Sequence, residues 1–597
     1  MNYKKRKAMN RIAFIICPQY TTTMPHLGIG YMRSIAEQAG YETKYIDFSA
    51  LYYLDYMYKK LLNTWISLHS KKIAMKTFYT LLPAVINYFN NKNKQNPLLQ
   101  SLYSYLQYEA KRMAHEIIDY GACIACFSIY DTTLLSSLAV AYELKKLRND
   151  IRIIFGGPFL YDERLRKVVE KFNHIVNNIV IGEGEFTLMA ILNNEVEEGK
   201  NVIIAEPIKD LDKLPFPTFE GCNFNLYYSA MRTSKTWHGL SISREKILPI
   251  IGMRGCPFNC AFCDHHIVWK SYRTRSIDNV IEEIKYNKKK YDCNIFRFND
   301  SLINSDIHWL EEFCSRLIDS KVGIYWYAHC RADKFSNKLA ELMYKSGCRY
   351  LKFGIESGSQ RVLNLMNKRI TPQKAIKAIR DAYEAGIKTR ASFIYAYPGE
   401  SREELFDTIK FIRECMDKLY GLRIYNFIFM PCTTIENKAE QHNIKLINFN
   451  IHDDDFKEIM SMLPEEWIHP EINEEEIRYR GELMKQVLEE FNSKINNYVP
   501  YMFSEIIENK LRSNHLIKHN EVKVKKLAEI NENIFLTADN GARIKIDKSI
   551  YNFIKGTEQF TVEMYRNEIN KFSKSQDERK YYQLLIDLIS CGILSIT

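Results

Sequence analysis

The sequence predicts an α/β protein with two parallel sheets, an N-terminal doubly wound, Rossmann-like sheet and a parallel strand–helix barrel. Short apolar runs alternate with amphipathic stretches from residue 11 to about 205, and the alternation resumes from 245 to about 440. A Pro-containing segment separates the two series. A mainly helical extension over 441–520 and a small α+β domain over 521–597 are expected to follow, because 597 residues are too many for one core.

The composition predicts a folded, cytoplasmic protein. Apolar residues make up 46% of the chain, and its net charge of +11 is spread over the whole length. The sequence lacks a dense Lys/Arg run with interleaved aromatic residues, so we expect no nucleic-acid partner. The cysteines are scattered apart from one triplet, and the start shows no signal cleavage site. The apolar run 78–89 is short and contains Pro83, so we expect no membrane partner.

The first domain is expected at residues 1–210. Its predicted strands are 11–17, 41–47, 122–128, 152–155 and 178–181, with helices at 28–40 and 134–147 and a helical insertion at about 50–115. Ligands of such sheets bind at the carboxyl ends of the strands. Two predicted strands end there in Gly156-Gly157-Pro158 and Gly182-Glu183-Gly184-Glu185, where glycines allow close approach of a ligand. Cys123 and Cys126 lie in a strand pattern and are expected in the core.

A linker at 211–244, stiffened by Leu-Pro-Phe-Pro at 214–217, should lead into the barrel at 245–440. The predicted barrel strands are 247–252, 294–298, 322–329, 350–353, 389–396 and 422–429. Active sites of barrels lie at the carboxyl ends of the strands. Asn299 and Asp300 follow the second strand, and Glu356 and Ser357 follow the fourth. An acid such as Glu356 in apolar surroundings is costly to bury without a partner.

Three cysteines follow the first barrel strand at a tight spacing. Cys256, Cys260 and Cys263 are separated by three residues and then two, so one loop can present three thiolates to one metal centre. A [4Fe-4S] cluster usually takes four cysteines, so three would leave one iron open to a small molecule. A structural zinc loop, with His265 or His266 as fourth ligand, and three buried thiols are the alternatives.

The triplet, with Phe262 directly before its third cysteine, resembles the radical S-adenosylmethionine (SAM) enzymes. The resemblance implies a partial (β/α)6 TIM-like barrel and a [4Fe-4S] cluster held by the three cysteines. It implies that SAM chelates the open iron and is cleaved to a 5'-deoxyadenosyl radical, with a flavodoxin- or ferredoxin-type electron donor. The SAM contacts that it implies are Phe262, Asn299, Asp300, Glu356, Ser357, Ser392 and Met430. Tyr395-Ala396-Tyr397 departs from relatives that have a glycine before Pro-Gly-Glu.

The N-terminal loops resemble the cobalamin-binding-type Rossmann domain that precedes the barrel in one large subfamily. The cobalamin contacts implied are Leu27, Gly28, Ser128, Gly156, Gly157, Gly182, Glu183 and Gly184. The sequence has no Asp-x-His-x-x-Gly motif, so no histidine is nominated as the lower axial ligand of cobalt. A domain without cobalamin that shapes the substrate pocket remains the alternative.

The last two regions carry weaker signals. A helix is expected at 470–491, a β-hairpin at 534–536 and 542–546, and helices at 548–554, 561–572 and 580–589. The hairpin with three helices is faintly similar to winged-helix peptide-recognition elements of enzymes that modify ribosomally made peptides. A lid or a dimerisation module is the alternative reading of this part.

Together these features predict a cobalamin-type radical SAM enzyme that functionalises an unactivated carbon by methyl transfer, acting on a small-molecule or peptide substrate. No catalytic acid or base can be nominated. Two alternatives stay open: a radical SAM enzyme that performs cyclisation, oxidation or rearrangement, and a zinc-binding scaffold protein. A tRNA methylthiotransferase is disfavoured, because three further cluster cysteines and a basic terminal module are not apparent.

Overall fold

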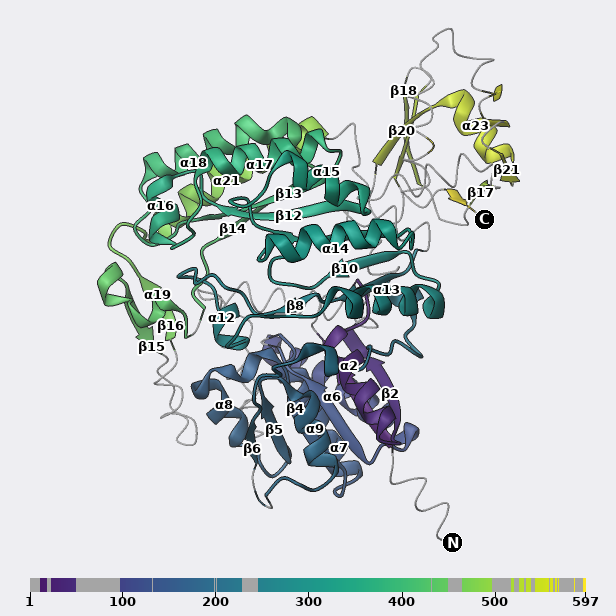
Figure 1. Ribbon diagram of the computed structural model, residues 1–597, viewed down its shortest axis with the longest axis vertical. Coiled ribbons are helices and arrows are strands. Elements are labelled where there is room, and N and C mark those ends of the chain that lie inside the picture. Colours follow the sequence, from purple (N-terminus) through teal and green to yellow (C-terminus); the bar gives the residue numbers. More distant parts are fainter. Residues whose placement is uncertain are drawn as a thin grey trace.

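Two six-stranded parallel sheets form the body of the molecule (Figure 1). The structure is a computed structural model that describes residues 11–18, 23–49, 97–130, 132–197, 199, 201–227, 245–430, 432–448 and 464–495, with separate segments between 517 and 596. The predicted α/β class, with a Rossmann-like sheet and a barrel-like sheet, is confirmed.

The first sheet has the strand order β2-β1-β3-β4-β5-β6. Its strands are β1 (Arg11–Ile16), β2 (Glu42–Asp47), β3 (Ile124–Ser128), β4 (Arg152–Gly156), β5 (Asn178–Ile181) and β6 (Val202–Ile204). The first five match the predicted strands to within two residues, and β6 was not predicted. The order reverses between β1 and β3, and doubly wound sheets bind ligands at that switch point.

Helices cover both faces of this sheet because its strands are apolar on both sides. Alternate residues of β1 divide between two cores: Phe14 packs with α2 (Leu27–Gln38) and α9 (Gly184–Leu192), and Ile15 packs with α6 (Pro97–Tyr120) and α7 (Leu134–Leu147). Helix α6 begins inside the insertion expected at about 50–115 and continues to residue 120. Residues 50–96 of that insertion lie outside the described residues.

The second sheet has the order β14-β13-β12-β11-β10-β7 and forms the partial barrel. Its strands are β7 (Ile247–Ile250), β10 (Ile295–Phe298), β11 (Tyr325–Cys330), β12 (Cys348–Glu356), β13 (Lys388–Tyr395) and β14 (Gly421–Asn426). The outer helices are α13 (Ile277–Tyr291), α14 (Ile307–Asp319), α15 (Asn337–Lys345), α16 (Gln360–Leu365), α17 (Pro372–Glu384) and α18 (Arg402–Cys415). Each begins at a Ser, Thr or Asp that accepts a backbone N–H of the first turn: Ser276, Asp306, Ser336, Ser359, Thr371 and Ser401.

The segment expected as a linker packs against both sheets' helices. The hydroxyl of Ser34 on α2 donates to the carbonyl of Phe216 at 2.6 Å, and the backbone N–H of Phe219 donates to the Tyr291 hydroxyl on α13 at 2.9 Å. Leu214 and Phe219 are buried. Residues 228–244 lie outside the described residues.

The region after the barrel differs from the mainly helical expectation. β15 (Lys445–Asn448) and β16 (Pro464–Ile468) pair as an antiparallel hairpin, which the acidic and mixed composition concealed. Helix α21 (Glu474–Ile495) follows, four residues later than predicted at each end. It packs on β13, β14 and α18, with Met484 and Val487 in the same core as the barrel helices.

The C-terminal region contains the predicted hairpin. β19 (Asn533–Thr537) pairs with β20 (Arg543–Asp547), and α23 (Lys548–Gly556) follows as expected. A third strand, β18 (Lys525–Ile530), and a second sheet of β21 (Gln559–Phe560), β17 (Ile517–His519) and β22 (Leu594–Ile596) were not predicted. Most of the helices expected at 561–572 and 580–589 falls outside the described residues, and the winged-helix resemblance stays a prediction.

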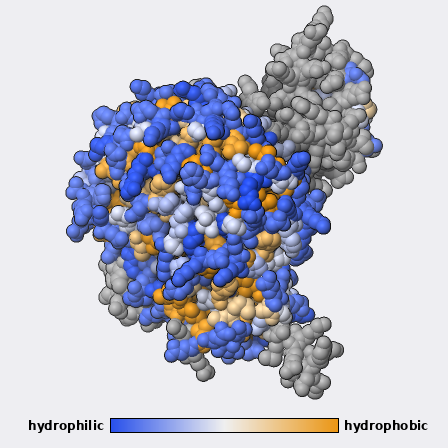
Figure 2. Space-filling view, in the orientation of Figure 1, coloured by the Kyte–Doolittle hydropathy of each residue, from blue (hydrophilic) through white to orange (hydrophobic). Residues whose placement is uncertain are grey.

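Hydrophilic residues dominate the visible surface, with apolar residues in small groups between them (Figure 2). None of the helices in the described parts of the chain is long and apolar enough to cross a membrane.

Candidate functional site

The three predicted cysteines lie on a closed loop at the carboxyl end of the first barrel strand. After β7, the short strand β8 (Met253–Arg254) pairs antiparallel with β9 (Arg273–Thr274), and the residues between them carry the cysteines. Gly255 opens the loop with φ +85°, and a Cβ there would overlap the carbonyl oxygen of Ser271. Only glycine fits this turn.

Backbone hydrogen bonds anchor the loop to later parts of the barrel. The N–H of Ala261 donates to the Met366 carbonyl at 2.9 Å, and the Ala261 carbonyl accepts from Ile435 at 3.0 Å. The N–H of Cys263 donates to the Cys260 carbonyl at 3.1 Å, which closes a turn between two of the cysteines. These backbone hydrogen bonds hold the loop in place on the barrel.

The three thiols lie within electrostatic reach of one another. Burial raises the pKa of Cys263 to about 12, the backbone N–H of His265 lowers it, and Cys260 and Cys256 raise it further. Burial also raises the pKa of Cys256, which a backbone hydrogen bond from Phe258 lowers. Thiols are therefore disfavoured as thiolates here unless a metal or a cation stabilises them.

Two cations of the barrel stand near these thiols. The charges of Arg331 and Lys368 lower the pKa of Cys256. The Arg331 guanidinium lies 3.8 Å from the ring centroid of Phe258, and the Lys368 ammonium lies 5.8 Å from that of Phe262. Both cations can balance the negative charge of a metal-bound thiolate set.

Thiolate donors and nearby cations fit an iron–sulfur cluster. Among the described residues, no group of three or more His, Cys, Asp or Glu side chains is arranged to hold a single ion. That finding does not conflict with a cubane, because each cysteine of a cubane binds a different iron. His265, which was considered as a fourth zinc ligand, has its Nδ1 3.0 Å from the Ser301 hydroxyl.

Asp300 organises the entrance to the cysteine loop. Its Oδ1 accepts from the backbone N–H groups of Gly252 at 2.9 Å and Met253 at 2.5 Å. Its other oxygen is buried and has no hydrogen-bond partner in the part of the chain that the structure describes, and burial raises the pKa of Asp300 to about 7. An orphaned buried oxygen fits a ligand that brings its own donor, such as an ammonium group. The neighbouring Asn299 is exposed, and its N–H donates to the Ile250 carbonyl at 2.8 Å.

The end of β12 is strained at Glu356. This residue has φ +74°, and the register between β12 and β13 shifts beside it. Its Oε1 accepts from the Lys368 ammonium at 2.9 Å in a buried ion pair. A Cβ on Gly354 would lie 2.5 Å from that same oxygen, so the glycine leaves room for the pair. An acid held in a left-handed conformation costs about 1–3 kcal/mol and is typical of functional sites.

The other predicted SAM contacts lie at the same end of the barrel but make different contacts. The Ser357 hydroxyl is buried and lies 3.1 Å from that of Thr408, and it accepts from the Ser359 N–H at 3.1 Å. Ser392 is half-buried on β13, and Phe262 is packed against the core. The carbonyl of Met430 accepts from the Thr433 hydroxyl at 2.7 Å.

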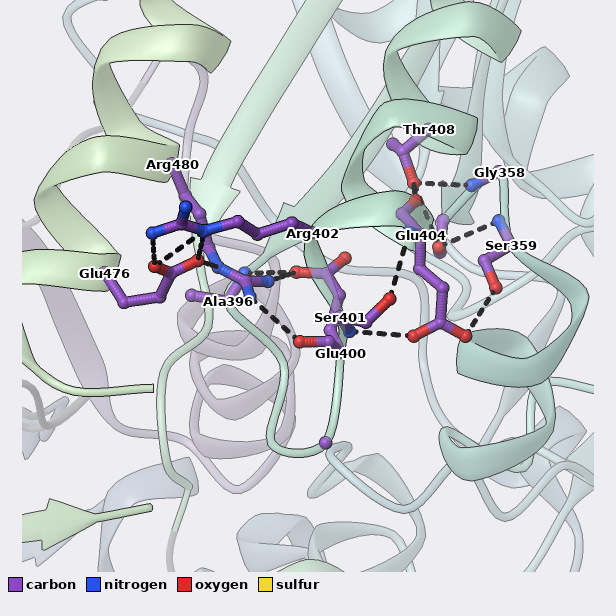
Figure 3. A network of polar contacts seen from close by, with 12 residues as sticks. Gly358, Ser359, Ala396, Glu400, Ser401, Arg402, Glu404, Thr408, Glu476 and Arg480 are labelled. Atoms are coloured by element: carbon purple, nitrogen blue, oxygen red, sulfur yellow. Dashed lines mark hydrogen bonds and ion pairs between the residues drawn. The ribbon is translucent and has the colours of Figure 1, made fainter. Parts of the chain in front are cut away.

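A buried polar network at the Pro-Gly-Glu turn, which the sequence did not reveal, joins helix α21 to the barrel (Figure 3). Glu400 Oε2 accepts from the Ala396 N–H and from Arg480 on α21, both at 2.8 Å. Arg480 also donates to Glu476 at 2.8 Å, and Arg402 pairs with Glu476 from the α18 side at 2.6 Å. Burial raises the pKa of Glu400 to about 7, against the lowering effect of Arg480.

Two acids of the first sheet meet the cysteine loop. Glu183 Oε2 accepts from Arg254 at 2.8 Å, its Oε1 accepts from Arg273 at 2.5 Å, and Arg254 also pairs with Glu185. Arg254 is 4% exposed and directly precedes Gly255. The carboxylate of Glu183, predicted as a cobalamin contact, is therefore engaged by two arginines of the barrel.

The remaining predicted cobalamin contacts lie at or beside the carboxyl ends of β3, β4 and β5 and at the start of α2. They are Leu27, Gly28, Ser128, Gly156, Gly157, Gly182 and Gly184. Gly157 has φ +123°, and a Cβ there would lie 2.5 Å from the Ile129 carbonyl oxygen. Gly182 has φ +91°, with the Ala205 carbonyl oxygen 3.1 Å from a Cβ position. The protein's own packing already requires glycine at these two positions.

The carboxyl edge of the first sheet faces the cysteine loop. The Tyr161 hydroxyl, after β4, lies 3.4 Å from Asp264 Oδ2, one residue past the third cysteine. Arg164 pairs with Glu436, beyond β14, at 3.0 Å. A ligand at the switch point of the first sheet would therefore lie on the side of the barrel that carries the three thiols. This arrangement fits a cofactor bound at the switch point.

Comparison with known proteins agrees with this arrangement. The Radical SAM superfamily family model matches residues 250–412. An uncharacterized methyltransferase (PH0819) of Pyrococcus horikoshii is 28% identical over 314 residues, covering 49% of this chain and 63% of that protein. Anaerobic magnesium-protoporphyrin IX monomethyl ester cyclase of Rubrivivax gelatinosus is 26% identical, covering 45% of this chain and 50% of the cyclase. The chain thus spans between half and 63% of these two relatives.

Solved structures share the fold across both sheets. The radical SAM methyltransferase TsrM of Kitasatospora setae, with cobalamin and a [4Fe-4S] cluster bound, aligns with a TM-score of 0.51 at 13% identity, covering 73% of this chain and 77% of TsrM. The cobalamin-dependent SAM radical enzyme OxsB aligns with a TM-score of 0.53 at 13% identity, covering 85% and 72%. At this identity the likeness establishes the fold. The family match covers the barrel that carries the cysteine loop, so this part of the chain is similar to the radical SAM superfamily.

Proposed function

We propose that this protein is a cobalamin-dependent radical SAM methyltransferase that transfers a methyl group to an unactivated carbon. The observation that carries the proposal is the placement of the cysteine loop opposite the carboxyl edge of the first sheet, held there by Arg254, Glu183 and Glu185. The methyltransferase relative and the fold shared with two cobalamin-dependent enzymes support it.

In this proposal Cys256, Cys260 and Cys263 bind three irons of a [4Fe-4S] cluster. A bound cluster and SAM would supply the 5'-deoxyadenosyl radical, and cobalamin at the first sheet would supply the methyl group. Asp300 holds the first turn of the loop through Gly252 and Met253, and its orphaned oxygen suits the amino group of SAM. Arg331 and Lys368 balance the thiolate charge, while Glu356 fixes the position of Lys368.

The proposed cobalamin contacts are backbone groups around Gly157 and Gly182 together with the start of α2. Glu183 acts differently from the sequence-based expectation: its carboxylate aligns the cysteine loop through Arg254 and Arg273. We further propose that the protein is cytoplasmic. A flavodoxin- or ferredoxin-type protein would donate the electron that reduces the cluster. The domain limits that we propose lie near residues 210, 245 and 440.

The test uses one cysteine variant with a matched control. Cys260→Ala should lose the iron and sulfide content, the broad absorbance near 400 nm and the formation of 5'-deoxyadenosine after anaerobic reconstitution. Cys314→Ala, in the buried core of α14, removes the same thiol from a site outside the loop and should keep all three. Equal iron in both variants, or zinc in place of iron, would overturn the cluster assignment.

Cobalamin is tested separately, by incubating the full chain with hydroxocobalamin and measuring what remains bound after gel filtration. About one equivalent should be retained. A protein that carries the cluster and cleaves SAM but retains no cobalamin would instead be a non-methylating radical SAM enzyme.

A further inference from the structure

The inner face of the barrel carries a row of basic side chains, one on each of five neighbouring strands. This cationic row consists of Arg297 on β10, His329 on β11, Lys352 on β12, Arg390 on β13 and Arg423 on β14. His329 lies opposite Lys352 in the strand register, and Lys352 lies opposite Arg390. Arg423 lies opposite Ser392, two residues beyond Arg390. Side chains at paired positions of parallel strands project to the same face.

The alternation along each strand assigns the row to the face away from the helices. The residues on either side of the row, such as Phe296, Leu351 and Phe353, pack in the core beneath the barrel helices. The row therefore points to the concave side of the sheet. On that side, Met24, Tyr227, Tyr327 and Tyr350 belong to one buried cluster next to the row.

Four side chains of the row lack the partners that buried cations elsewhere in this protein have; of the four, Lys352 is buried, Arg297 and Arg390 are half-buried and Arg423 is exposed. Arg254, Arg480 and Lys368 each pair with a glutamate. Within the described residues, no acid or hydrogen bond pairs with the side chains of Arg297, Lys352, Arg390 or Arg423, and the Nε atoms of Arg297 and Arg390 are buried without acceptors. Lys352 is 6% exposed, and its ammonium lies 5.3 Å from the Tyr327 ring centroid.

The members of the row also act on each other electrostatically. Burial and then the charges of Arg297, Arg390 and Arg423 lower the pKa of Lys352 well below its ordinary value. Burial and then the charges of Lys352, Arg297 and Arg390 lower the pKa of His329 well below its ordinary value. Basic groups placed this close disfavour one another's charged forms, and a bound anion would stabilise those forms.

We propose that the cationic row binds the substrate of this enzyme through oxyanions, and that this substrate carries several phosphoryl or carboxylate groups. Five adjacent strands span roughly 19 Å at the usual strand spacing. The single carboxylate of SAM cannot serve so long a row. The identification of the bound molecule as substrate rests on the proposed function, whereas the anion site itself does not.

The test measures binding of two simple probes to the full chain at constant ionic strength. Inorganic pyrophosphate represents a phosphoryl substrate and citrate a polycarboxylate one. Isothermal titration calorimetry and thermal denaturation should show that one of them binds and raises the Tm, as any ligand selective for the folded state does. Saturating SAM should leave that binding in place.

Three variants identify the site. Lys352→Met and Arg390→Met should each lower the affinity for the bound probe at least tenfold. Lys374→Met, which removes an exposed lysine of α17, should leave that affinity unchanged. Because Lys352 is unpaired and buried, Lys352→Met should also keep or raise the Tm of the free protein, so a folding defect is not expected.

The inference is overturned if neither probe binds, if Lys352→Met and Arg390→Met bind as tightly as the unaltered chain, or if SAM displaces the probe completely. Binding by pyrophosphate alone assigns a phosphoryl substrate, and binding by citrate alone assigns a polycarboxylate. The Cys260→Ala chain separates this inference from the proposed function, because it should lose the cluster and still bind the probe.

Discussion

Replacing Arg254 by methionine tests how much the buried ion pairs between the two sheets contribute to the stability of the protein. Arg254 is 4% exposed and pairs with Glu183 and Glu185, which are 4% and 8% exposed. In Arg254→Met, Glu183 keeps its pair with Arg273, so the uncompensated charge falls mainly on Glu185. Removing one partner of a buried pair costs about 3–5 kcal/mol, and the remaining Arg273 contact places the expected loss at about 3 kcal/mol.

The measurement is urea-induced unfolding of the full chain, followed by circular dichroism and tryptophan fluorescence. Arg316→Met is the control, because Arg316 is 39% exposed and its partner Asp278 is 73% exposed. Exposed pairs contribute about 0–1 kcal/mol, so this variant should change little. Adding Glu185→Gln to Arg254→Met should recover part of the loss. If Arg254→Met unfolds like Arg316→Met, the reasoning about buried charge at this interface is wrong.

Two further predictions concern backbone packing and pH. Gly157→Ala should lower the free energy of unfolding by about 1–3 kcal/mol, since the added Cβ would lie 2.5 Å from the Ile129 carbonyl oxygen. Gly199→Ala is the control: Gly199 also has a positive φ, but no described atom lies within 4 Å of its Cβ position, so this variant should lose less. Equal losses in the two variants would contradict the steric argument. For Asp300, burial raises the folded-state pKa from 3.8 to about 7, so the folded state keeps a proton that the unfolded state loses. Stability should therefore fall between about pH 4 and 7, by up to ~4 kcal/mol in all. Asp300→Asn should remove that part of the slope in urea titrations at each pH, and an unchanged slope would show that Asp300 ionises normally.

Much of the framework follows from local sequence. The parallel strands are short apolar runs, and the tight spacing of Cys256, Cys260 and Cys263 identifies one metal loop without any structure. Asp300 and Glu356 were predicted near this loop because the carboxyl ends of parallel strands share one edge. The hairpin of β15 and β16 was missed because its few apolar residues lie among acidic ones.

The contacts that complete the site join residues far apart in the chain, which no local pattern encodes. Glu183 meets Arg254, and Glu400 meets Arg480, across 71 and 80 positions. The strained backbone of Glu356 and its ion pair with Lys368 have no signature in the sequence. The cationic row did leave a signal: strands of a parallel sheet are usually apolar on both faces, and Arg297, Lys352, Arg390 and Arg423 break that rule on four strands of one sheet.

Helix α21 has a consequence for how the protein folds during its synthesis. It covers the outer side of β14, and Arg480 on it neutralises the buried Glu400 of the barrel. Yet β14 ends at Asn426 and α21 begins only at Glu474. At ribosomal speeds of about 5–20 residues per second, the barrel stays incomplete for roughly 2–10 s after its last strand has been made. Closure of the barrel by α21 therefore depends on residues outside the region that the family model matches.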